Sequence, residues 1–362
     1  MNIRGIAILL SLSAGVSACG AKVVGLDASM IEASDEPDVL GIVHEKIEKL
    51  VVDDQRLYWV GTQHVVPIGS HYDWWLHSCQ KRACASTIVT YDAQGSTNDI
   101  VFAVLGDRIY WHGPNIGQLA SCPIEGCGGS PETLVPWVRF RSAAFDDEYF
   151  YYAVSSGRLN RLSFSQPGSV QPLSPKVDFA SVYIHGDYVY LLALDPKSLK
   201  YQGILSLVRT RKDGTSSIEL ISDEVRASFV HHEFDVTADQ SSIYWSDNLL
   251  VGSINRCPLT GCSGAPEVVL APVRVPQTLL IDGSRLYYAY ETKSGQNAVS
   301  SCALAACEPS LPLIEQLDSS GALAFDEQYL YAATNQQDAD FHTGQGTVVR
   351  LIRVPKPDAL LP

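Results

Sequence analysis

The sequence predicts an all-β fold, a seven-bladed β-propeller built from four-stranded antiparallel blades. One strand–turn–strand pattern, with a tyrosine at the same place in its second strand, recurs seven times along the 362 residues. Each copy is followed by a polar loop and then by further short segments that resemble strands. Four short strands repeated about every forty residues are typical of a propeller, in which twisted sheets pack around a central channel.

The seven copies align on the shared tyrosine without gaps, and we number them repeats 1 to 7. They span 50–59, 102–111, 143–152, 182–191, 236–245, 279–288 and 323–332, with the tyrosine at Tyr58, Tyr110, Tyr151, Tyr190, Tyr244, Tyr287 and Tyr331. Five copies place an aspartate five residues earlier, at Asp53, Asp146, Asp239, Asp282 and Asp326. Because an aspartate side chain can accept hydrogen bonds from amides two residues on, we interpret these as turn residues and not as catalytic groups.

The third and fourth strands of each blade follow the tyrosine. Third strands are expected at 117–122, 157–162, 252–257 and 346–351, and fourth strands at 132–135, 218–221 and 267–270. A closed ring needs one more outer strand in the last blade, because an unpaired edge invites aggregation. Residues 37–44 are the favoured source of that strand, and residues 358–361 are the alternative.

The N-terminus is predicted to be a lipoprotein export signal. Residues 1–18 combine Arg4 with an apolar stretch too short to span a membrane, and they end in Val16-Ser17-Ala18 before Cys19. Cys19 would carry the lipid, residues 19–36 would form a flexible tether, and residues 37–362 would form the propeller. An ordinary secretory signal is the alternative.

The other eight cysteines form four C-x4-C pairs, each between the expected third and fourth strands of a repeat. The pairs are Cys79/Cys84, Cys122/Cys127, Cys257/Cys262 and Cys302/Cys307. Even numbers at one spacing in an exported chain predict four local disulfides, on the outer rims of separate blades. Metal binding is the alternative, but zinc ligands usually come as C-x2-C pairs gathered in fours. We therefore predict no metal and no cofactor.

Charge excludes one class of partner. The chain has 26 Lys and Arg against 40 Asp and Glu, a net charge of −14. A protein that binds nucleic acid needs clustered positive charge to neutralise phosphates, so no nucleic-acid partner is expected.

The segment Ile243-Tyr244-Trp245-Ser246-Asp247 resembles the signature of YWTD-type propeller repeats, and the chain as a whole resembles a bacterial exported lipoprotein with such repeats. The resemblance implies the propeller fold and no particular partner, and YWTD propellers usually have six blades where this chain has seven copies. Gly20 after the lipidated cysteine implies the outer membrane, with the side of that membrane left open.

Candidate functional residues lie on the face formed by the loops between second and third strands and by the connections between blades. A possible ligand site at the mouth of the channel comprises His231, His232, Glu233, Arg139 and Arg141. Further contacts on the loop face are His64, His71, Tyr72, Trp74, Trp75 and His112. We expect a non-catalytic scaffold that binds a protein, peptide or glycan. The alternative is a lyase or hydrolase with a His/Glu site at the channel mouth.

Overall fold

The computed structural model describes most of the chain beyond its N-terminal segment. The described residues are 31–32, 39–43, 45–64, 72–93, 100–113, 117–136, 140–154, 157–174, 179–194, 202–228, 235–247, 249–308, 312–317, 322–335 and 349–356. The predicted signal segment and Cys19 lie outside them, as does all of the predicted tether except residues 31–32. No helix of the described residues is long and apolar enough to cross a membrane.

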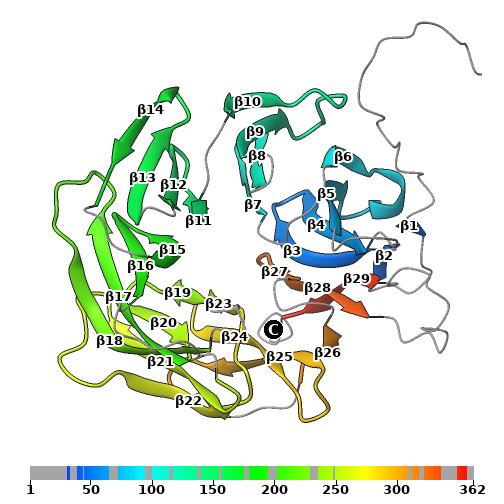
Figure 1. Ribbon diagram of the computed structural model, residues 1–362. Helices are drawn as coiled ribbons and strands as arrows, with labels where there is room; N and C mark the ends of the chain where they lie inside the picture. The colour runs from blue at the N-terminus through cyan, green and yellow to red at the C-terminus, as the bar shows by residue number, and fades with distance from the viewer. Residues whose placement is uncertain are drawn as a thin grey trace, which may run out of the picture.

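Repeats 1 to 5 each form a separate four-stranded antiparallel sheet (Figure 1). Repeat 1 contains β3 (Lys46–Val52), β4 (Arg56–His64), β5 (Tyr72–Gln80) and β6 (Val89–Ala93), and repeat 2 contains β7 (Val101–Leu105), β8 (Arg108–Gly113), β9 (Gln118–Pro123) and β10 (Glu132–Val135). Repeat 3 contains β11 (Phe140–Phe145), β12 (Tyr149–Val154), β13 (Arg158–Ser163) and β14 (Gln166–Pro172). Repeat 4 contains β15 (Phe179–His185), β16 (Tyr188–Leu194), β17 (Gln202–Arg211) and β18 (Glu219–Ser228), and repeat 5 contains β19 (Val236–Ala238), β20 (Ser242–Ser246), β21 (Gly252–Pro258) and β22 (Glu267–Val273).

Repeats 6 and 7 differ from the expectation of separate sheets, because their strands are joined into one nine-stranded sheet. Repeat 6 contributes β23 (Leu279–Asp282), β24 (Arg285–Glu291), β25 (Asn297–Ala303) and β26 (Ile314–Leu317). Repeat 7 contributes β27 (Leu323–Phe325), β28 (Tyr329–Asn335) and β29 (Val349–Pro355), which pairs with β2 (Val39–Val43) and through it with β1 (Ile31–Glu32). A single residue pair, Leu317 with Thr334, links the two halves. The link forms because the short strand β26 ends against β28.

The first strands of successive sheets meet at the centre of the molecule, which gives the propeller-like arrangement. Strand β7 contacts β11, β11 contacts β15, β15 contacts β19, and β19 contacts β23. Strand β27 of repeat 7 contacts β3 of repeat 1, so the two ends of the repeat array meet. Figure 1 shows the sheets radiating from this centre.

Strand β2 supplies the outer strand next to β29, which confirms the expectation for residues 37–44. It runs antiparallel to β29, with Val43 opposite Val349 and Ile42 opposite Arg350. Val43, Val349 and Leu351 are buried in one cluster with Ile47 of β3, so N-terminal and C-terminal strands share a core. The alternative segment 358–361 lies outside the described residues.

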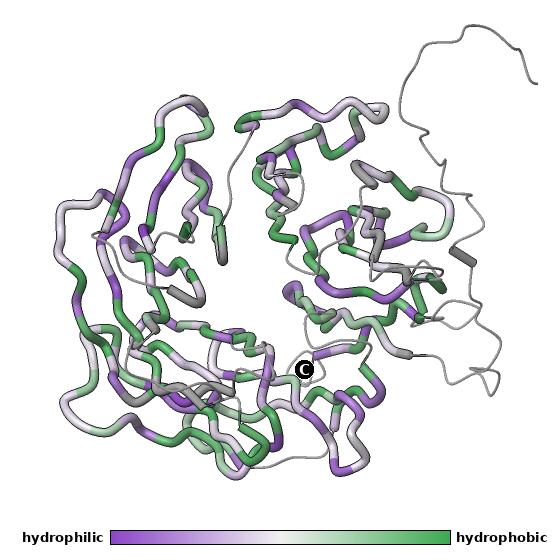
Figure 2. Tube along the Cα trace, viewed as in Figure 1, coloured by the Kyte–Doolittle hydropathy of each residue, from purple (hydrophilic) through white to green (hydrophobic). Residues whose placement is uncertain are grey.

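The core lies between adjacent sheets and follows the tyrosine column. Six of the seven tyrosines are at most 2% exposed. The second strands are buried on both faces, since four consecutive residues are buried in each of β12, β20 and β24. Figure 2 shows hydrophobic residues in the strands of each sheet, so each sheet has apolar side chains to bury against its neighbours. Burial of these aromatic side chains is the main favourable term that holds the sheets together.

Four of the five repeat aspartates have the predicted turn geometry. Asp146 accepts hydrogen bonds from the amides of Glu148 and Tyr149 at 3.0 and 2.8 Å, and its other oxygen accepts from the Tyr151 hydroxyl at 3.1 Å. The same three bonds recur at Asp53, Asp239 and Asp326.

Asp282 is the exception among the repeat aspartates. It lies opposite Arg285 in a tighter hairpin and pairs with Lys356. Gly283 takes a φ of 55° in that hairpin, a conformation that glycine adopts without strain.

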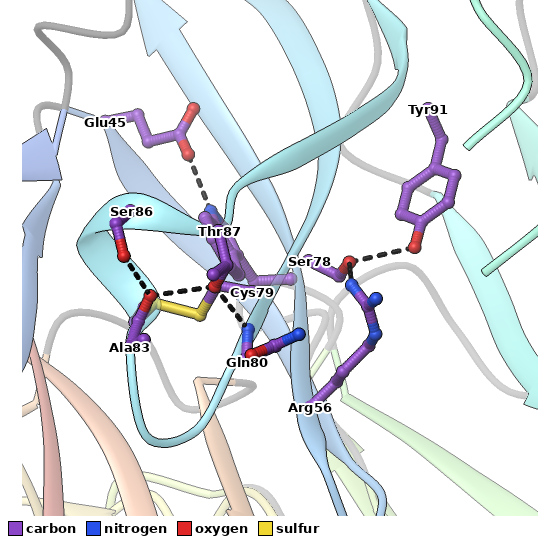
Figure 3. The surroundings of a disulfide bond; sticks show 11 residues. Glu45, Arg56, Ser78, Cys79, Gln80, Ala83, Ser86, Thr87 and Tyr91 are labelled. Carbon is purple, nitrogen blue, oxygen red and sulfur yellow. Dashed lines mark hydrogen bonds between the residues drawn. A yellow bond between two sulfur atoms is a disulfide. The ribbon is translucent and has the colours of Figure 1, made fainter. Parts of the chain in front are cut away.

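All four predicted disulfides are present. They join Cys79 to Cys84, Cys122 to Cys127, Cys257 to Cys262 and Cys302 to Cys307. Figure 3 shows the first bridge, where the Thr87 hydroxyl accepts a hydrogen bond from the Gln80 amide at 2.9 Å and donates one to the Ala83 carbonyl at 2.8 Å. The described residues contain no group of three or more His, Cys, Asp or Glu that could hold a metal ion.

The bridges reach deeper than the expected position on the outer rims of the blades. The first cysteine of each pair lies on a third strand and is at most 5% exposed. The second is buried only at Cys84, in the short 3-10 helix η2 (Cys84–Ser86). Cys127, Cys262 and Cys307 are half-buried, and each packs against the same core cluster as its bonded partner. The rim prediction is therefore wrong for the first cysteines, because the third strand carries them between two sheets. Each bridge ties an outer turn to the core.

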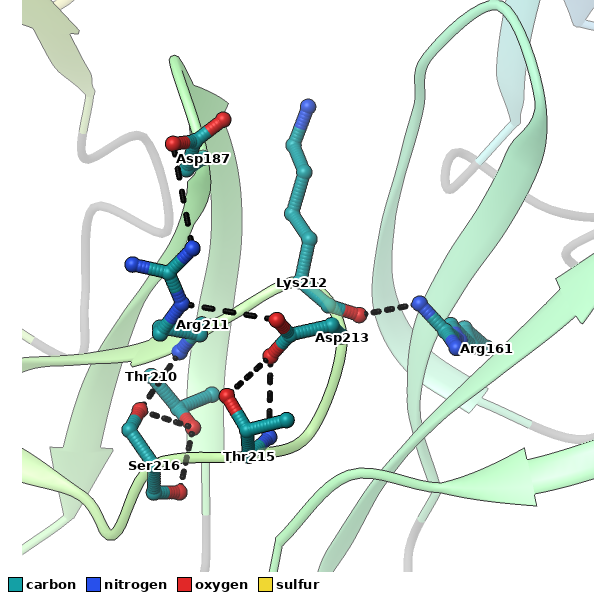
Figure 4. A network of polar contacts seen from close by, with 8 residues as sticks. All are labelled: Arg161, Asp187, Thr210, Arg211, Lys212, Asp213, Thr215 and Ser216. Atoms are coloured by element: carbon teal, nitrogen blue, oxygen red, sulfur yellow. Dashed lines mark hydrogen bonds and ion pairs between the residues drawn. The ribbon is translucent and has the colours of Figure 1, made fainter.

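The hairpin between β17 and β18 shows how a polar turn is stabilised at the sheet periphery. Asp213 accepts hydrogen bonds from the Thr215 amide and hydroxyl at 2.9 and 2.6 Å and faces Arg211, as Figure 4 shows. The Arg161 guanidinium of repeat 3 donates to the Lys212 carbonyl of repeat 4. These contacts tie neighbouring sheets together at the end of the hairpin.

Candidate functional site

Three of the predicted loop-face residues are instead part of the core. Trp74 and Trp75 lie on β5 and are 1% and 9% exposed. Trp74 packs with Tyr58 and Trp111 between repeats 1 and 2. His112 is fully buried, and its ring centroid lies 3.9 Å from that of Phe140. The prediction that these side chains contact a ligand is therefore wrong, because the second and third strands extend further than expected and carry them between sheets.

The other predicted residues stay predictions. His64 ends β4 opposite Tyr72, the first residue of β5, and Arg141 lies on β11. His71, Arg139 and the segment His231, His232, Glu233 lie outside the described residues.

A groove of about 270 Å³ lies between repeats 4 and 5, and the sequence did not predict it. Arg226 of β18 forms its repeat-4 side. The repeat-5 side consists of Asp247, Leu249, Val251, Gly252, Ser253, Val268, Ala271 and Pro272. Most of this lining is apolar, and it includes one carboxyl group, that of Asp247.

Asp247 is 8% exposed and connects the two repeats. One carboxyl oxygen accepts a hydrogen bond from the Arg226 amide at 3.0 Å, and the other accepts one from the Ser253 hydroxyl at 3.2 Å. Burial raises the pKa of Asp247, and these hydrogen bonds, together with the Asn255 side chain and the charge of Arg226, only partly offset that shift. None of the ion pairs between described residues involves Asp247.

The loop that carries Asp247 is held tightly at its base while its tip is exposed. The Asp247 amide donates to the Ser253 carbonyl at 2.8 Å, and the Val275 amide donates to the Leu249 carbonyl at 3.2 Å. A Cβ atom at Gly252 would lie 2.0 Å from the Asp247 carbonyl oxygen, so this position requires glycine. Leu250 and Val251 at the tip are 57% and 67% exposed.

A second carboxyl group lies at the same end of repeat 5, where Asp235 precedes β19. It accepts hydrogen bonds from the amides of Val236 and Leu279 at 2.9 and 2.8 Å, the second of which links repeat 5 to repeat 6. Although part of the residue reaches the surface, removal of the carboxyl from bulk water raises the pKa of Asp235 to about 6. The two amides and the positive charge of Lys49 on β3 lower it less. An acid that titrates near neutral pH suits proton transfer.

A third buried carboxyl, Glu45, lies near the junction of the first and last repeats. It is 2% exposed, and one oxygen accepts a hydrogen bond from the Trp59 indole at 2.7 Å and lies 3.5 Å from His77 Nε2. The other oxygen has no hydrogen-bond partner among the described residues. The side chain fills the space that Gly61 leaves, so a Cβ at that position would overlap it. Glu45, Trp59 and His77 are each at most 5% exposed, so the core encloses this cluster.

Sequence reasoning named Asp247 only as part of a repeat signature and did not mark Asp235. The signal that could have found Asp247 is its position directly before the loop that carries Leu249, Leu250 and Val251, three consecutive apolar residues. Consecutive apolar residues in a loop between second and third strands are difficult to bury. Asp235 carries no comparable signal.

No family model and no curated protein matches the chain. Solved structures do. The acylaminoacyl peptidase of Pyrococcus horikoshii matches 85% of this chain with a TM-score of 0.55 at 11% identity, and this chain spans about half (51%) of that enzyme's length. The structure of U3-55K matches 91% of this chain and 100% of its own, with a TM-score of 0.54 at 11% identity. At such low identity these similarities show a shared fold and nothing about function.

Proposed function

We propose that this protein is a lipid-anchored, seven-bladed propeller of the bacterial cell envelope that acts as a non-catalytic scaffold for a partner protein. The observation that supports it is the distribution of exposed apolar side chains. Six large hydrophobic residues are 36% to 67% exposed, and all lie in repeats 3 to 6: Val170, Leu220, Leu250, Val251, Val268 and Leu313. The described residues of repeats 1, 2 and 7 have none of comparable exposure.

Exposed apolar residues that lie close together mark an interaction surface more often than scattered ones do, and here Val251 and Val268 line one groove. We call this set of six residues the apolar side. It favours a protein or peptide over a glycan as the partner, because two of the six line one groove and a third adjoins it in the chain. Strands β1 and β2 join the ring next to repeat 7, and repeats 3 to 5, which carry five of the six residues, lie away from them in Figure 1. The sixth residue, Leu313, lines a pocket together with Val39 of β2. The lipid at Cys19 would therefore leave the part of the apolar side in repeats 3 to 5 free.

The count of seven blades is supported by the strands of repeats 6 and 7. Each contributes four strands, β23 to β26 and β27, β28, β29 and β2. The single pair between Leu317 and Thr334 would then be a contact between two blades at one point. The four disulfides suit an oxidising compartment outside the cytoplasm.

The proposal is tested by recovering cross-linked partners of the full-length protein from a native envelope extract. We expect a variant with serine at Leu250, Val251 and Val268 to lose about tenfold or more of the recovered partner. A control with serine at Arg82 and Asp107, two exposed residues of repeats 1 and 2, should recover as much as the unaltered protein. Equal recovery by both variants would contradict the proposal.

A lyase or hydrolase at the channel mouth is the second candidate function, and the pKa of Asp235 is the observation that favours it. Asp235 follows the His231, His232, Glu233 segment by two residues. Model esters, glycosides and acidic polysaccharides would test it with the full-length protein. Turnover lost in both His232→Ala and Asp235→Asn would support an enzyme, and no turnover on any of these substrate classes would count against it.

A further inference from the structure

We propose that the groove between repeats 4 and 5 binds a polypeptide segment in which a lysine or arginine is flanked by apolar residues. This inference rests on the proposed function, because the groove opens on the apolar side. It goes further by naming the chemistry of the segment that is recognised. The groove would receive the cationic side chain, and its rim would contact the flanking apolar residues.

The size of the groove favours a side chain over a small-molecule ligand. Its volume of about 270 Å³ is below the range of about 300–1,000 Å³ that is usual for cofactor and metabolite sites. A long side chain with its neighbouring backbone fits such a volume.

The lining provides apolar contact beside the carboxyl group. Val251 and Val268 are 67% and 57% exposed and both line the groove. Leu249, Ala271 and Pro272 add further apolar surface to the lining. The aliphatic stem of a lysine or arginine packs well against such a surface while its charged end reaches a polar group.

The lining of the groove includes the carboxyl group of Asp247, which takes part in none of the ion pairs between described residues. Asp247 accepts a hydrogen bond on each oxygen, from the Arg226 amide and the Ser253 hydroxyl, and the Asn255 side chain also stabilises its charged form. A carboxylate has about four acceptor positions, so it can accept further hydrogen bonds. Because no described ion pair involves Asp247, a cation from a partner would compensate a charge that burial destabilises. Arg226 also lines the groove: its backbone amide donates to the carboxyl group, and its positive charge lowers the pKa of Asp247 less than burial raises it.

The net charge of the chain acts in the same direction. With 40 acidic against 26 basic residues, the protein attracts positively charged segments over distances longer than a contact. An acidic peptide would meet both this repulsion and the Asp247 carboxylate. The charge complementarity therefore selects a basic segment.

A library of random twelve-residue peptides displayed on phage tests the proposal with the full-length protein. We expect enriched peptides to contain lysine or arginine next to apolar residues. Synthetic copies should bind about tenfold more weakly to Asp247→Asn and about fivefold more weakly to Val251→Ser, measured by fluorescence anisotropy. Leu220→Ser is the matched control, since Leu220 is 58% exposed on the apolar side but does not line the groove, and its affinity should change less than about twofold.

Other outcomes would overturn the inference, and they separate it from the proposed function. One such outcome is a set of enriched peptides that bind more weakly to Val251→Ser but equally well to Asp247→Asn, and another is a set that contains no lysine or arginine. Either result would show an apolar docking surface and would contradict the proposed recognition of a cation. No enriched peptide, or affinities unaffected by both groove variants, would remove the groove as a site. The cross-linking comparison would still decide whether the apolar side binds a partner. Equal melting temperatures of the variants, together with native affinity of Leu220→Ser, would exclude unfolding as the cause of a loss.

Discussion

Repeat 5 carries aspartates at both ends of the hairpin formed by β19 and β20, and their pKa values shift in opposite directions. At the turn, burial raises the pKa of Asp239, but hydrogen bonds from the Tyr244 hydroxyl, the amides of Ser241 and Ser242 and the Ser241 hydroxyl together lower it more, so the net shift is downward. These bonds are 2.7 to 2.9 Å long. At the opposite end, the pKa values of Asp235 and Asp247 are raised.

Asp239 differs from Asp235 and Asp247 in the number of hydrogen bonds that offset the effect of burial on the carboxylate. Asp239 accepts four hydrogen bonds, whereas Asp235 accepts two amide bonds through its carboxyl group and Asp247 accepts one amide and one hydroxyl. A carboxylate that is fully bonded is stabilised in its charged form and acts as a structural element. A buried carboxyl with acceptor positions to spare is more often part of a site. The turn end of this hairpin, with Asp239, is therefore structural, and the opposite end, with Asp235 and Asp247, is the candidate binding face.

The largest effect is expected where a turn aspartate also pairs with a lysine of the neighbouring sheet. Asp326 lies 2.6 Å from Lys81 and accepts hydrogen bonds from Tyr331, Gln328 and Tyr329. Asp326→Ala would leave a mostly buried lysine without its partner and should lower the free energy of unfolding by about 3 kcal/mol in urea titrations. Asp239→Ala leaves no described lysine without a partner and should lower the free energy of unfolding by about 1 to 2 kcal/mol. Equal losses would show that the lysine contributes nothing.

These variants also carry a pH signature. Burial raises the pKa of Asp326, but Lys81, Tyr331 and the two amides lower it more, so the net pKa lies below its ordinary value. Its stabilisation is therefore present above the ordinary aspartate pKa near 4 and is lost as the pH falls through the folded value. Asp326→Ala should remove this acid sensitivity.

A comparably local change should disturb the groove end of repeat 5. Gly252→Ala would bring a Cβ within 2.0 Å of the Asp247 carbonyl oxygen, a backbone atom that cannot move aside easily. We expect a loss of about 2 kcal/mol in the free energy of unfolding. Gly264→Ala is the control, because a Cβ there would meet no atom within 4 Å. A loss equal to that of the control would mean that the loop relaxes freely.

The raised pKa of Asp235 predicts a pH dependence of opposite sign to that of Asp326. With a folded pKa of about 6, the folded state binds more protons than the unfolded state between about pH 4 and pH 6, so the free energy of unfolding falls as the pH rises through that window. Two pKa units correspond to about 3 kcal/mol, and we expect about 2 kcal/mol because the residue is partly exposed. The Asp235→Asn variant should lose this dependence of the free energy of unfolding on pH, even where its stability at a single pH differs from that of the unaltered protein. An unchanged slope would assign it to another group.

The smallest effect separates the two kinds of aspartate most directly. Asp247→Asn removes a charge that burial destabilises, so stability at neutral pH should change by less than about 0.5 kcal/mol. Asp239→Asn replaces an acceptor of four hydrogen bonds and should cost about 1 kcal/mol. Thermal unfolding monitored by circular dichroism would measure both. A larger cost at Asp247 than at Asp239 would reverse the assignment of the two faces.

The repeat pattern was readable from the sequence because it depends on local chemistry. The Asp–Tyr spacing follows from a turn in which one side chain accepts amides two and three residues on and a hydroxyl five residues on. The C-x4-C spacing closes a short loop, and the segment 37–44 matches an outer strand that a ring requires. Each of these features is determined within a few residues or by the need to leave no edge unpaired.

The tertiary structure alone decided which side chains are exposed. Trp74 and His112 resemble loop residues in the sequence, but they are buried because neighbouring sheets pack against both faces of their strands. The groove at Asp247 arises where Arg226 of one repeat meets the loop of the next, across a separation of about twenty residues. The link between repeats 6 and 7 likewise depends on where β26 ends. The sequence by itself determined the repeated unit, and the packing of one unit against the next decided burial, pKa and the candidate site, because those depend on neighbours that lie far away in the chain.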